Sequence, residues 1–259
     1  MLFFCYFVLL VVSVSAVPKT QIVDGSVAND CEFPSIVYIR IYLQSSGSAF
    51  SICGGALIDS THVLTAAHCV TGDIKKVKVS IGSNLRSRKS NSRSVSNIVK
   101  HSEYTNILGD PEDYIVKNDI AILTLNQSVS EGNCVRFASL ASQGETFGTS
   151  RCIAAGWGRL APDGNIPDAL YKVPLPIVPH DECKKNSIMQ ISEGVLCAGD
   201  FVLGGASTCH GDSGGPLYCP NSNGEMVLAG VNSFGYECDE DINAFTDVGY
   251  FRNWIQTHL

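Results

Sequence analysis

Short apolar runs rich in β-branched and aromatic residues recur along this chain, and they limit its fold more than any other feature. The runs are SIVYIRIYL at 35–43, GALIDSTHVLTA at 55–66, VKVSIG at 77–82, DIAILTL at 119–125, CIAAGWG at 152–158 and MVLAGVNSFG at 226–235. Glycine, asparagine, serine and proline separate them, without intervening helical patterns, which predicts an all-β chain of antiparallel sheets forming a sandwich or barrels. Only the C-terminal stretch has helical spacing, with one apolar face made by Val248, Phe251, Trp254 and Ile255.

The N-terminus carries a continuous apolar run, LFFCYFVLLVV at 2–12. It is far shorter than the roughly 20 residues that span a bilayer. Small residues follow as far as Ala16, so we interpret residues 1–16 as a secretory signal peptide. The later segments are not apolar enough to anchor the chain. We therefore expect a secreted, extracellular protein without a membrane partner.

Cysteine content and charge narrow the class further. The chain has 11 cysteines, and loss of Cys5 with the signal peptide would leave an even set. Such a set in a secreted chain indicates disulfide bonds, and the absence of a CxxC pair argues against a zinc site. The net charge of -7 argues against nucleic acid as a partner. The sequon at Asn126 is a candidate glycosylation site.

Three short motifs carry chemistry when they are taken together. They are LTAAHC at 64–69, NDIAIL at 118–123 and CHGDSGGPL at 209–217. Their histidine, aspartate and serine, in that order, resemble the trypsin/chymotrypsin family of serine proteases. GWG at 156–158 and CAG at 197–199 extend the resemblance, which runs from Ile22 to the C-terminal helix. The family's fold implies two packed six-stranded antiparallel β-barrels with the active site in the cleft between them.

The resemblance also implies a domain plan. A signal peptide at 1–16 and a propeptide at 17–21 would precede a serine protease domain at 22–259. Within that domain we expect an N-terminal barrel at 22–140, a C-terminal barrel at 141–246 and a C-terminal helix at 247–259.

By resemblance, His68, Asp119 and Ser213 form a catalytic triad of a serine endopeptidase that works through an acyl-enzyme. A serine hydroxyl is a weak nucleophile near neutral pH, so a histidine must accept and return its proton. The aspartate would hold the histidine ring in one tautomer and stabilise the imidazolium. The backbone N–H groups of Gly211 and Ser213 match the oxyanion hole, and Ser233 matches the serine that supports the buried aspartate.

The segment VPKTQ at 17–21 is expected to be removed when a zymogen is activated. In this family a freed Ile or Val amine pairs with the aspartate beside the nucleophile, so Ile22 would pair with Asp212. The unusual feature is Gln21, because relatives commonly have Arg or Lys before the cut. Either a non-tryptic activating protease cuts after Gln21, or a cut after Lys19 is followed by removal of a dipeptide.

Specificity for P1, the residue before the scissile bond, is expected at a pocket formed by Ser207, Ser233, Gly235 and Asn243. A neutral base at Ser207 cannot compensate a buried ammonium or guanidinium, which predicts a chymotrypsin-like preference for large hydrophobic residues. An Asn at 243 in place of glycine would shorten the pocket, so an elastase-like preference stays open. Carboxylates within 237–241 leave a trypsin-like or mixed preference open as well.

Five disulfide bonds are expected. Four are carried over from the family: Cys53–Cys69, Cys152–Cys219, Cys183–Cys197 and Cys209–Cys238. Exclusion then leaves Cys31–Cys134.

The remaining expectations concern ligands and partners. The loop at 83–94 lies where many relatives bind calcium through carboxylates, but it has none, so we expect neither a metal nor a cofactor. The long segment between Tyr104 and Asp119 is expected to rim the cleft. The partners implied are protein or peptide substrates and protein protease inhibitors, for a monomeric enzyme. A catalytically silent homologue acting as a binding module is the rival interpretation, and retention of all three triad residues argues against it.

Overall fold

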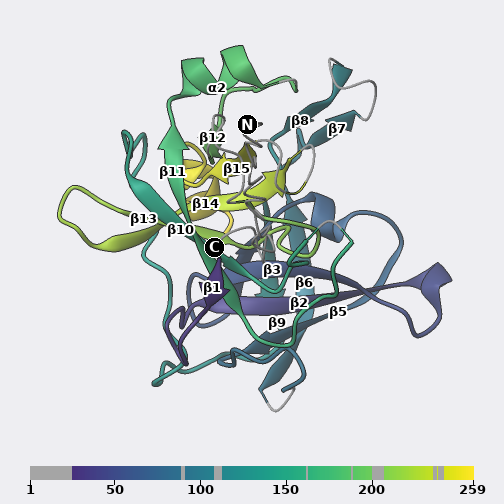
Figure 1. The fold of residues 1–259 in the computed structure, drawn as a ribbon. Helices are drawn as coiled ribbons and strands as arrows, with labels where there is room; N and C mark the ends of the chain where they lie inside the picture. Colours follow the sequence, from purple (N-terminus) through teal and green to yellow (C-terminus); the bar gives the residue numbers. More distant parts are fainter. Residues whose placement is uncertain are drawn as a thin grey trace, which may run out of the picture.

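The computed structural model describes residues 25–88, 91–107, 113–161, 163–187, 189–199, 207–235, 238 and 242–259. Strands dominate this part of the chain and form two barrels that lie against each other (Figure 1). The all-β class of two six-stranded antiparallel barrels is thus confirmed. The expected signal peptide, the propeptide and Ile22 lie outside the described residues.

The first barrel is closed by six antiparallel strands in the order β2-β3-β4-β9-β6-β5. Their bounds are Ile36–Leu43 for β2, Ser51–Leu57 for β3, His62–Thr65 for β4, Ile74–Ile81 for β5, Ser92–Lys100 for β6 and Ala121–Leu125 for β9. Pairing of β5 with β2, with Val37 opposite Ile81, closes the ring. A separate two-stranded sheet, β7 (Thr105–Ile107) with β8 (Ile115–Lys117), lies against the second half of the chain, because Ile115 forms a bridge with Gln190 and Val116 packs in a cluster with Val178 and Phe234.

The second barrel is built from a seven-stranded sheet in the order β1-β11-β10-β13-β14-β15-β12. The bounds are Ser26–Val27 for β1, Arg151–Gly156 for β10, Tyr171–Val178 for β11, Val195–Ala198 for β12, Pro216–Pro220 for β13, Met226–Phe234 for β14 and Asn243–Asp247 for β15. A further pairing of β11 with β12 closes six of these strands into a ring. The remaining strand, β1, pairs with β11, so the start of the expected N-terminal barrel region joins the second barrel.

Two short α-helices accompany the barrels in the described chain, α2 (His180–Asn186) and α3 (Arg252–Thr257), with 3₁₀ turns η1 (Gln44–Ser46) and η2 (His68–Val70). Acidic residues in the first turn of α2 and lysines in its last turn complement the helix dipole. None of the described helices is long and apolar enough to cross a membrane.

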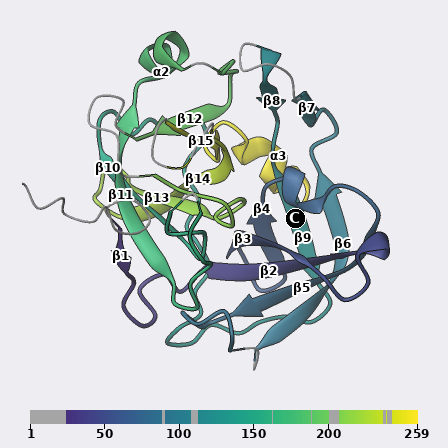
Figure 2. The same ribbon diagram turned by 45° about the vertical axis from the view of Figure 1, so that its right-hand side comes forward.

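The C-terminal helix is shorter than expected. The sequence predicts a helix over 247–259, but β15 extends to Asp247 and a turn follows before α3 begins at Arg252. The apolar residues of this segment are nevertheless buried. Val248, Phe251 and Ile255 pack into the same core cluster as the first barrel. The end of the chain thus returns from the second barrel to the first (Figure 2).

Strand β2 lies at the seam between the barrels, which explains why its sequence is apolar except for the buried Arg40. Residues 36–41 are all buried, so neither face of the strand meets solvent. Tyr38 on β2 packs edge-on against Trp157, which follows β10 of the second barrel, with ring centroids 5.6 Å apart. A strand covered on both faces has no need for polar alternation.

The structure contains five disulfide bonds among the described residues. They join Cys31 to Cys134, Cys53 to Cys69, Cys152 to Cys219, Cys183 to Cys197 and Cys209 to Cys238, the same pairs that the resemblance and exclusion gave. The second pair ties β3 to the turn that carries His68, and the last closes a loop beside the cleft.

The two barrels touch through backbone at Gly54 of β3. Its N–H donates to the carbonyl oxygen of Ser213 at 2.7 Å, and Thr65 Oγ1 donates to its carbonyl at 2.8 Å. A Cβ at Gly54 would lie 2.7 Å from the Cα of Gly215. Only a residue without a side chain allows this approach, which holds the Ser213 turn against the first barrel.

This contact predicts that Gly54→Ala lowers the free energy of unfolding by about 1–3 kcal/mol, because overpacking a filled site forces backbone shifts. Thermal or denaturant unfolding of the full chain measures the loss. Gly132→Ala is the matched control, since a Cβ there meets no atom within 4 Å. Equal stabilities of the two variants would contradict the proposed close approach.

Candidate active site

His68 is held by two hydrogen bonds to one carboxylate. It lies on η2, directly after β4, and its backbone N–H donates to Asp119 Oδ1 at 2.8 Å. Its ring Nδ1 lies 2.7 Å from Asp119 Oδ2. A carboxylate oxygen accepts, so Nδ1 carries the proton and Nε2 of the neutral ring is left as an acceptor. The ring is a quarter exposed and the carboxylate is 2% exposed.

Asp119 receives further donors from the second barrel. Ser233 Oγ, on β14, donates to Asp119 Oδ2 at 2.5 Å. Thr246 Oγ1, on β15, donates to the backbone carbonyl of Asp119 at 2.7 Å. The preceding residue, Asn118, has a φ of 53°, a left-handed conformation that asparagine tolerates better than most residues. This turn presents the aspartate inward, immediately before β9.

Two tyrosines stand beside the buried carboxylate. Burial raises the pKa of Tyr104 to about 12, and the nearby charge of Asp119 acts in the same direction. Burial and Asp119 also raise the pKa of Tyr114. Both phenols therefore stay neutral over the physiological pH range and add no charge near Asp119, and Tyr114 also borders the cleft.

Ser213 and His68 both border a cleft of about 270 Å³ that residues of both barrels line. The turn carrying it is anchored to β14, because Gly214 N–H donates to the carbonyl of Asn232 at 2.8 Å. Gly211 has a φ of 106°, which strongly favours glycine, and a Cβ there would approach Gly158 Cα to 3.1 Å. The predicted oxyanion-hole residues thus lie in a turn whose geometry depends on glycine.

Asp212, next to Ser213, is a second buried carboxylate. It is 3% exposed and accepts backbone N–H groups from Gly158 at 2.7 Å and from Cys209 at 3.0 Å. Burial raises its pKa to about 6, although both hydrogen bonds oppose the shift. No cationic side chain of the described chain pairs with it. A Cβ at Gly156 or Gly158 would lie 2.0 or 2.3 Å from its oxygens, which explains both glycines of GWG.

Three of the four expected specificity residues border the cleft, and the fourth does not. Ser233, Gly235 and Asn243 border the cleft, as the resemblance implies. Ser207 is 3% exposed and does not belong to the described residues that border the cleft, whereas the adjacent Thr208 does.

Sequence reasoning missed two polar residues of the cleft. Thr208 donates its backbone N–H, at 2.7 Å, and its hydroxyl to Asn243 Oδ1. Asn232 also borders the cleft and is 7% exposed. The available signal was an asparagine that directly follows the apolar run MVLAGV at 226–231 and precedes Ser233.

The long segment between Tyr104 and Asp119 contributes to the cleft. Asn106 of β7, Tyr114 and Val116 of β8 all border it. Residues 108–112 of this segment lie outside the described chain.

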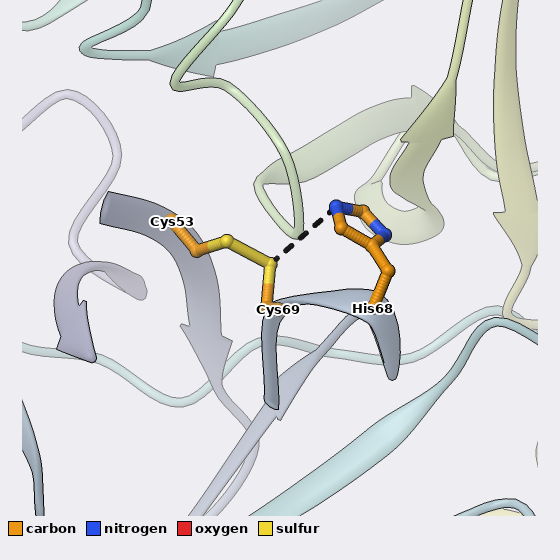
Figure 3. Close-up of side chains that lie close together, drawn as sticks. All are labelled: Cys53, His68 and Cys69. Carbon is orange, nitrogen blue, oxygen red and sulfur yellow. Dashed lines mark hydrogen bonds between the residues drawn. A yellow bond between two sulfur atoms is a disulfide. The ribbon is translucent and has the colours of Figure 1, made fainter. Parts of the chain in front are cut away.

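His68 also lies beside a disulfide (Figure 3). Its Nε2 is 3.7 Å from Cys69 Sγ, and Cys69 is bonded to Cys53. These three residues form the one Cys/His/Asp/Glu group in the described chain that is compact enough for a metal ion. Because both sulfurs are in a disulfide, neither can supply the thiolate that binds zinc.

Comparison with known proteins agrees with this geometry. The family model described as Trypsin matches residues 22–255. Chymotrypsin-like elastase family member 3B of Homo sapiens is 32% identical over 249 residues, covering 93% of this chain and 90% of that protein. Trypsin-1 of Astacus astacus is 32% identical over 249 residues, covering 92% and 99%. Trypsin-3 of Salmo salar is 34% identical over 224 residues, covering 84% and 87%.

The match extends over nearly the whole chain and includes both barrels and the cleft between them. The chain belongs to the trypsin family and is a serine endopeptidase.

Proposed function

We propose that this chain is a secreted serine endopeptidase, made as a zymogen, in which Ser213 is the nucleophile, His68 the general base and Asp119 its partner. The observation that carries the proposal is the arrangement around Asp119. Its buried carboxylate binds Nδ1 of His68, and His68 and Ser213 border one cleft. A histidine whose Nδ1–H is fixed presents a basic Nε2 to that cleft.

In the proposed reaction, Ser213 Oγ attacks the carbonyl carbon of the scissile bond while His68 Nε2 takes the hydroxyl proton. Collapse of the tetrahedral intermediate breaks the C–N bond, and His68 returns the proton to the leaving amine. Water then attacks the acyl-enzyme with His68 again as base, which frees the carboxylic acid and restores Ser213. The imidazolium formed in each step is stabilised by the charge of Asp119.

The oxyanion of the intermediate is proposed to bind the backbone N–H groups of Gly211 and Ser213. A preorganised pair of donors needs no rearrangement as charge develops, and loss of one typically costs about 2.7–4 kcal/mol of barrier. The positive φ of Gly211 supports this assignment, because a side chain there would force the turn into another conformation.

Activation is proposed to free the amine of Ile22, which then pairs with Asp212. Ile22 lies outside the described residues, so support comes from its partner. The Asp212 carboxylate is buried, and its described partners are backbone N–H groups rather than a cation. A buried carboxylate is costly without a counter-charge, and an incoming ammonium group would supply one.

For specificity we propose a P1 residue that is large, hydrophobic and uncharged. Apart from Asp119, which is already held by His68 and Ser233, the described residues that border the cleft include no carboxylate to pair with Lys or Arg. A Cβ at Gly235 would meet only the carbonyl of Ile242, at 3.7 Å, so that wall is open. The four acids within 237–241 that could reverse this preference lie outside the described chain.

The role of Ser213 is tested with a fluorophosphonate probe on protein processed to begin at Ile22. We expect one label, on Ser213, and none on Ser213→Ala. Asp119→Asn should slow peptide hydrolysis by about 10⁴-fold, because His68 would then hold the wrong tautomer. Ser222→Ala, at an exposed serine, is the matched control and should label normally. A folded chain that begins at Ile22 and takes no label would favour the binding-module alternative.

The Asp212 pair is tested through the pH dependence of stability. The pKa of about 6 in the folded chain exceeds the ordinary value of 3.8, so the folded state favours the protonated acid. Without a counter-charge, protonated Asp212 contributes its full share to the free energy of unfolding below pH 4. That contribution, on the order of 3 kcal/mol, is lost as the pH rises through 6. The Ile22 ammonium should restore it.

We therefore expect the melting temperature of the cleaved chain to exceed that of the precursor by a margin that grows from pH 4 to pH 7. Both forms carry Ser213→Ala to prevent self-digestion. In Asp212→Asn the margin should not change with pH. A constant margin in the chain that retains Asp212 would contradict the pair.

A further inference from the structure

An asparagine amide that is accessible from the cleft borders the specificity pocket. Asn232, on β14, is 7% exposed and borders the cleft. Its backbone groups pair with Gly214 and Gly215, but its side chain makes no hydrogen bond within the described parts of the chain. Neither amide atom is among the fully buried polar atoms that lack a partner, so the amide is accessible from the cleft that Asn232 borders. A group bound in the cleft can therefore pair with it.

Thr208 supplies a second polar group, and its hydroxyl oxygen is left to act as a hydrogen-bond acceptor. Its hydroxyl proton and its backbone N–H are both donated to Asn243 Oδ1. With the proton committed, the lone pairs of Thr208 Oγ1 remain as acceptors. The amide of Asn243 is engaged at both of its polar atoms, because one N–H of its Nδ2 donates to the carbonyl of Ala198 at 3.4 Å. The pocket thus offers an acceptor at Thr208, and an acceptor and a donor at Asn232.

We propose that Asn232 and Thr208 make this pocket selective for the side-chain amide of glutamine at P1, in preference to methionine, a residue of similar length without hydrogen-bonding groups. This inference rests on the proposed peptidase function and revises its P1 preference, from a hydrophobic side chain to an uncharged side chain that carries an amide. The glutamine Nε2–H₂ would donate to Thr208 Oγ1 and to Asn232 Oδ1, and its Oε1 would accept from Asn232 Nδ2. Glutamate lacks the donor that Thr208 requires.

The sequence presents such a glutamine at the proposed activation bond. Gln21 directly precedes Ile22, so the enzyme's own precursor has an amide side chain at P1. Hydrolysis there breaks the Gln21–Ile22 peptide bond, transfers the acyl group to Ser213 of another molecule, and frees the Ile22 amine. The activating protease would then be a second copy of this chain.

The first experiment compares P1 residues in one peptide series. Residues 17–21 of the full chain are replaced by the recognition sequence of an added protease that leaves Ile22 first. Peptides differing only in P1 as Gln, Met, Glu, Phe or Lys are then compared by kcat/KM. We expect Gln to exceed both Met and Glu by about tenfold, the ratio that one or two buried hydrogen bonds supply.

Asn232→Val tests the residue itself. Valine suits a strand position, so the fold should persist. The Gln-to-Met ratio should fall about tenfold, and Thr208→Val should lower it in the same direction. Asn97→Val, the same change at an exposed position of β6, is the matched control and should leave the ratio unchanged. A ratio unaffected by Asn232→Val would overturn the assignment.

The second experiment uses the natural precursor as substrate. A full chain with Ser213→Ala cannot process itself, and adding a trace of active enzyme should produce an N-terminus at Ile22. Gln21→Glu should slow this processing about tenfold, in line with the peptide series.

The outcomes separate the two proposals. Failure to cleave any peptide, together with failure of Ser213 to take a fluorophosphonate, would overturn the proposed function itself. Cleavage of Met or Phe peptides with Gln slower than Met would leave that function standing and overturn the amide-selective pocket. Glu peptides cleaved as fast as Gln would also overturn it.

Discussion

The carboxylate of Asp119 is the interaction on which the rest of the site depends. Asp119 lies just before strand β9 of the first barrel, and its side chain is almost fully buried. A buried charge is stable only when it is well hydrogen-bonded, and here two of its donors come from His68. A third donor to the carboxylate is Ser233 of the second barrel, and Thr246 of the same barrel donates to the backbone carbonyl of Asp119. The barrels can satisfy this charge only when they are docked correctly.

A second buried carboxylate provides an instructive contrast. Asp119 is held by side-chain donors from both barrels, whereas Asp212 is held by backbone N–H groups of its own barrel. Its raised pKa reflects burial without a cation. On the proposed account, Asp119 is satisfied by folding alone, and Asp212 is satisfied only after a bond elsewhere in the chain is cut. Activity would then be linked to cleavage through the free energy of a single buried charge.

Much of the fold follows from the apolar runs, and the exceptions have physical reasons. Strand β2 was evident because both its faces are covered, whereas β11 was not, because Pro174 and Pro176 each lack the N–H that a strand normally donates. Most residues of β6 are only partly buried, so its sequence shows little apolar pattern. Helix α2 is too short to show a period.

The candidate site divides in a similar way. His68, Asp119 and Ser213 were found because they lie within distinctive motifs. Four disulfides were carried over from the family, and exclusion gave Cys31–Cys134. Pocket residues such as Asn232 and Thr208 carry no motif. Their importance arises from which hydrogen bonds are already taken, and that depends on where Asn243 lies in three dimensions. Sequence spacing alone contains no such information.

The central claim, that Asp119 holds the Nδ1–H of His68, is tested most directly by proton NMR of the processed enzyme. A proton held between an imidazole nitrogen and a buried carboxylate resonates far downfield, and it exchanges slowly with solvent. We expect one far-downfield resonance that disappears in both His68→Ala and Asp119→Asn, while folding is retained. Absence of that resonance in the unsubstituted enzyme, or its persistence in Asp119→Asn, would contradict the account.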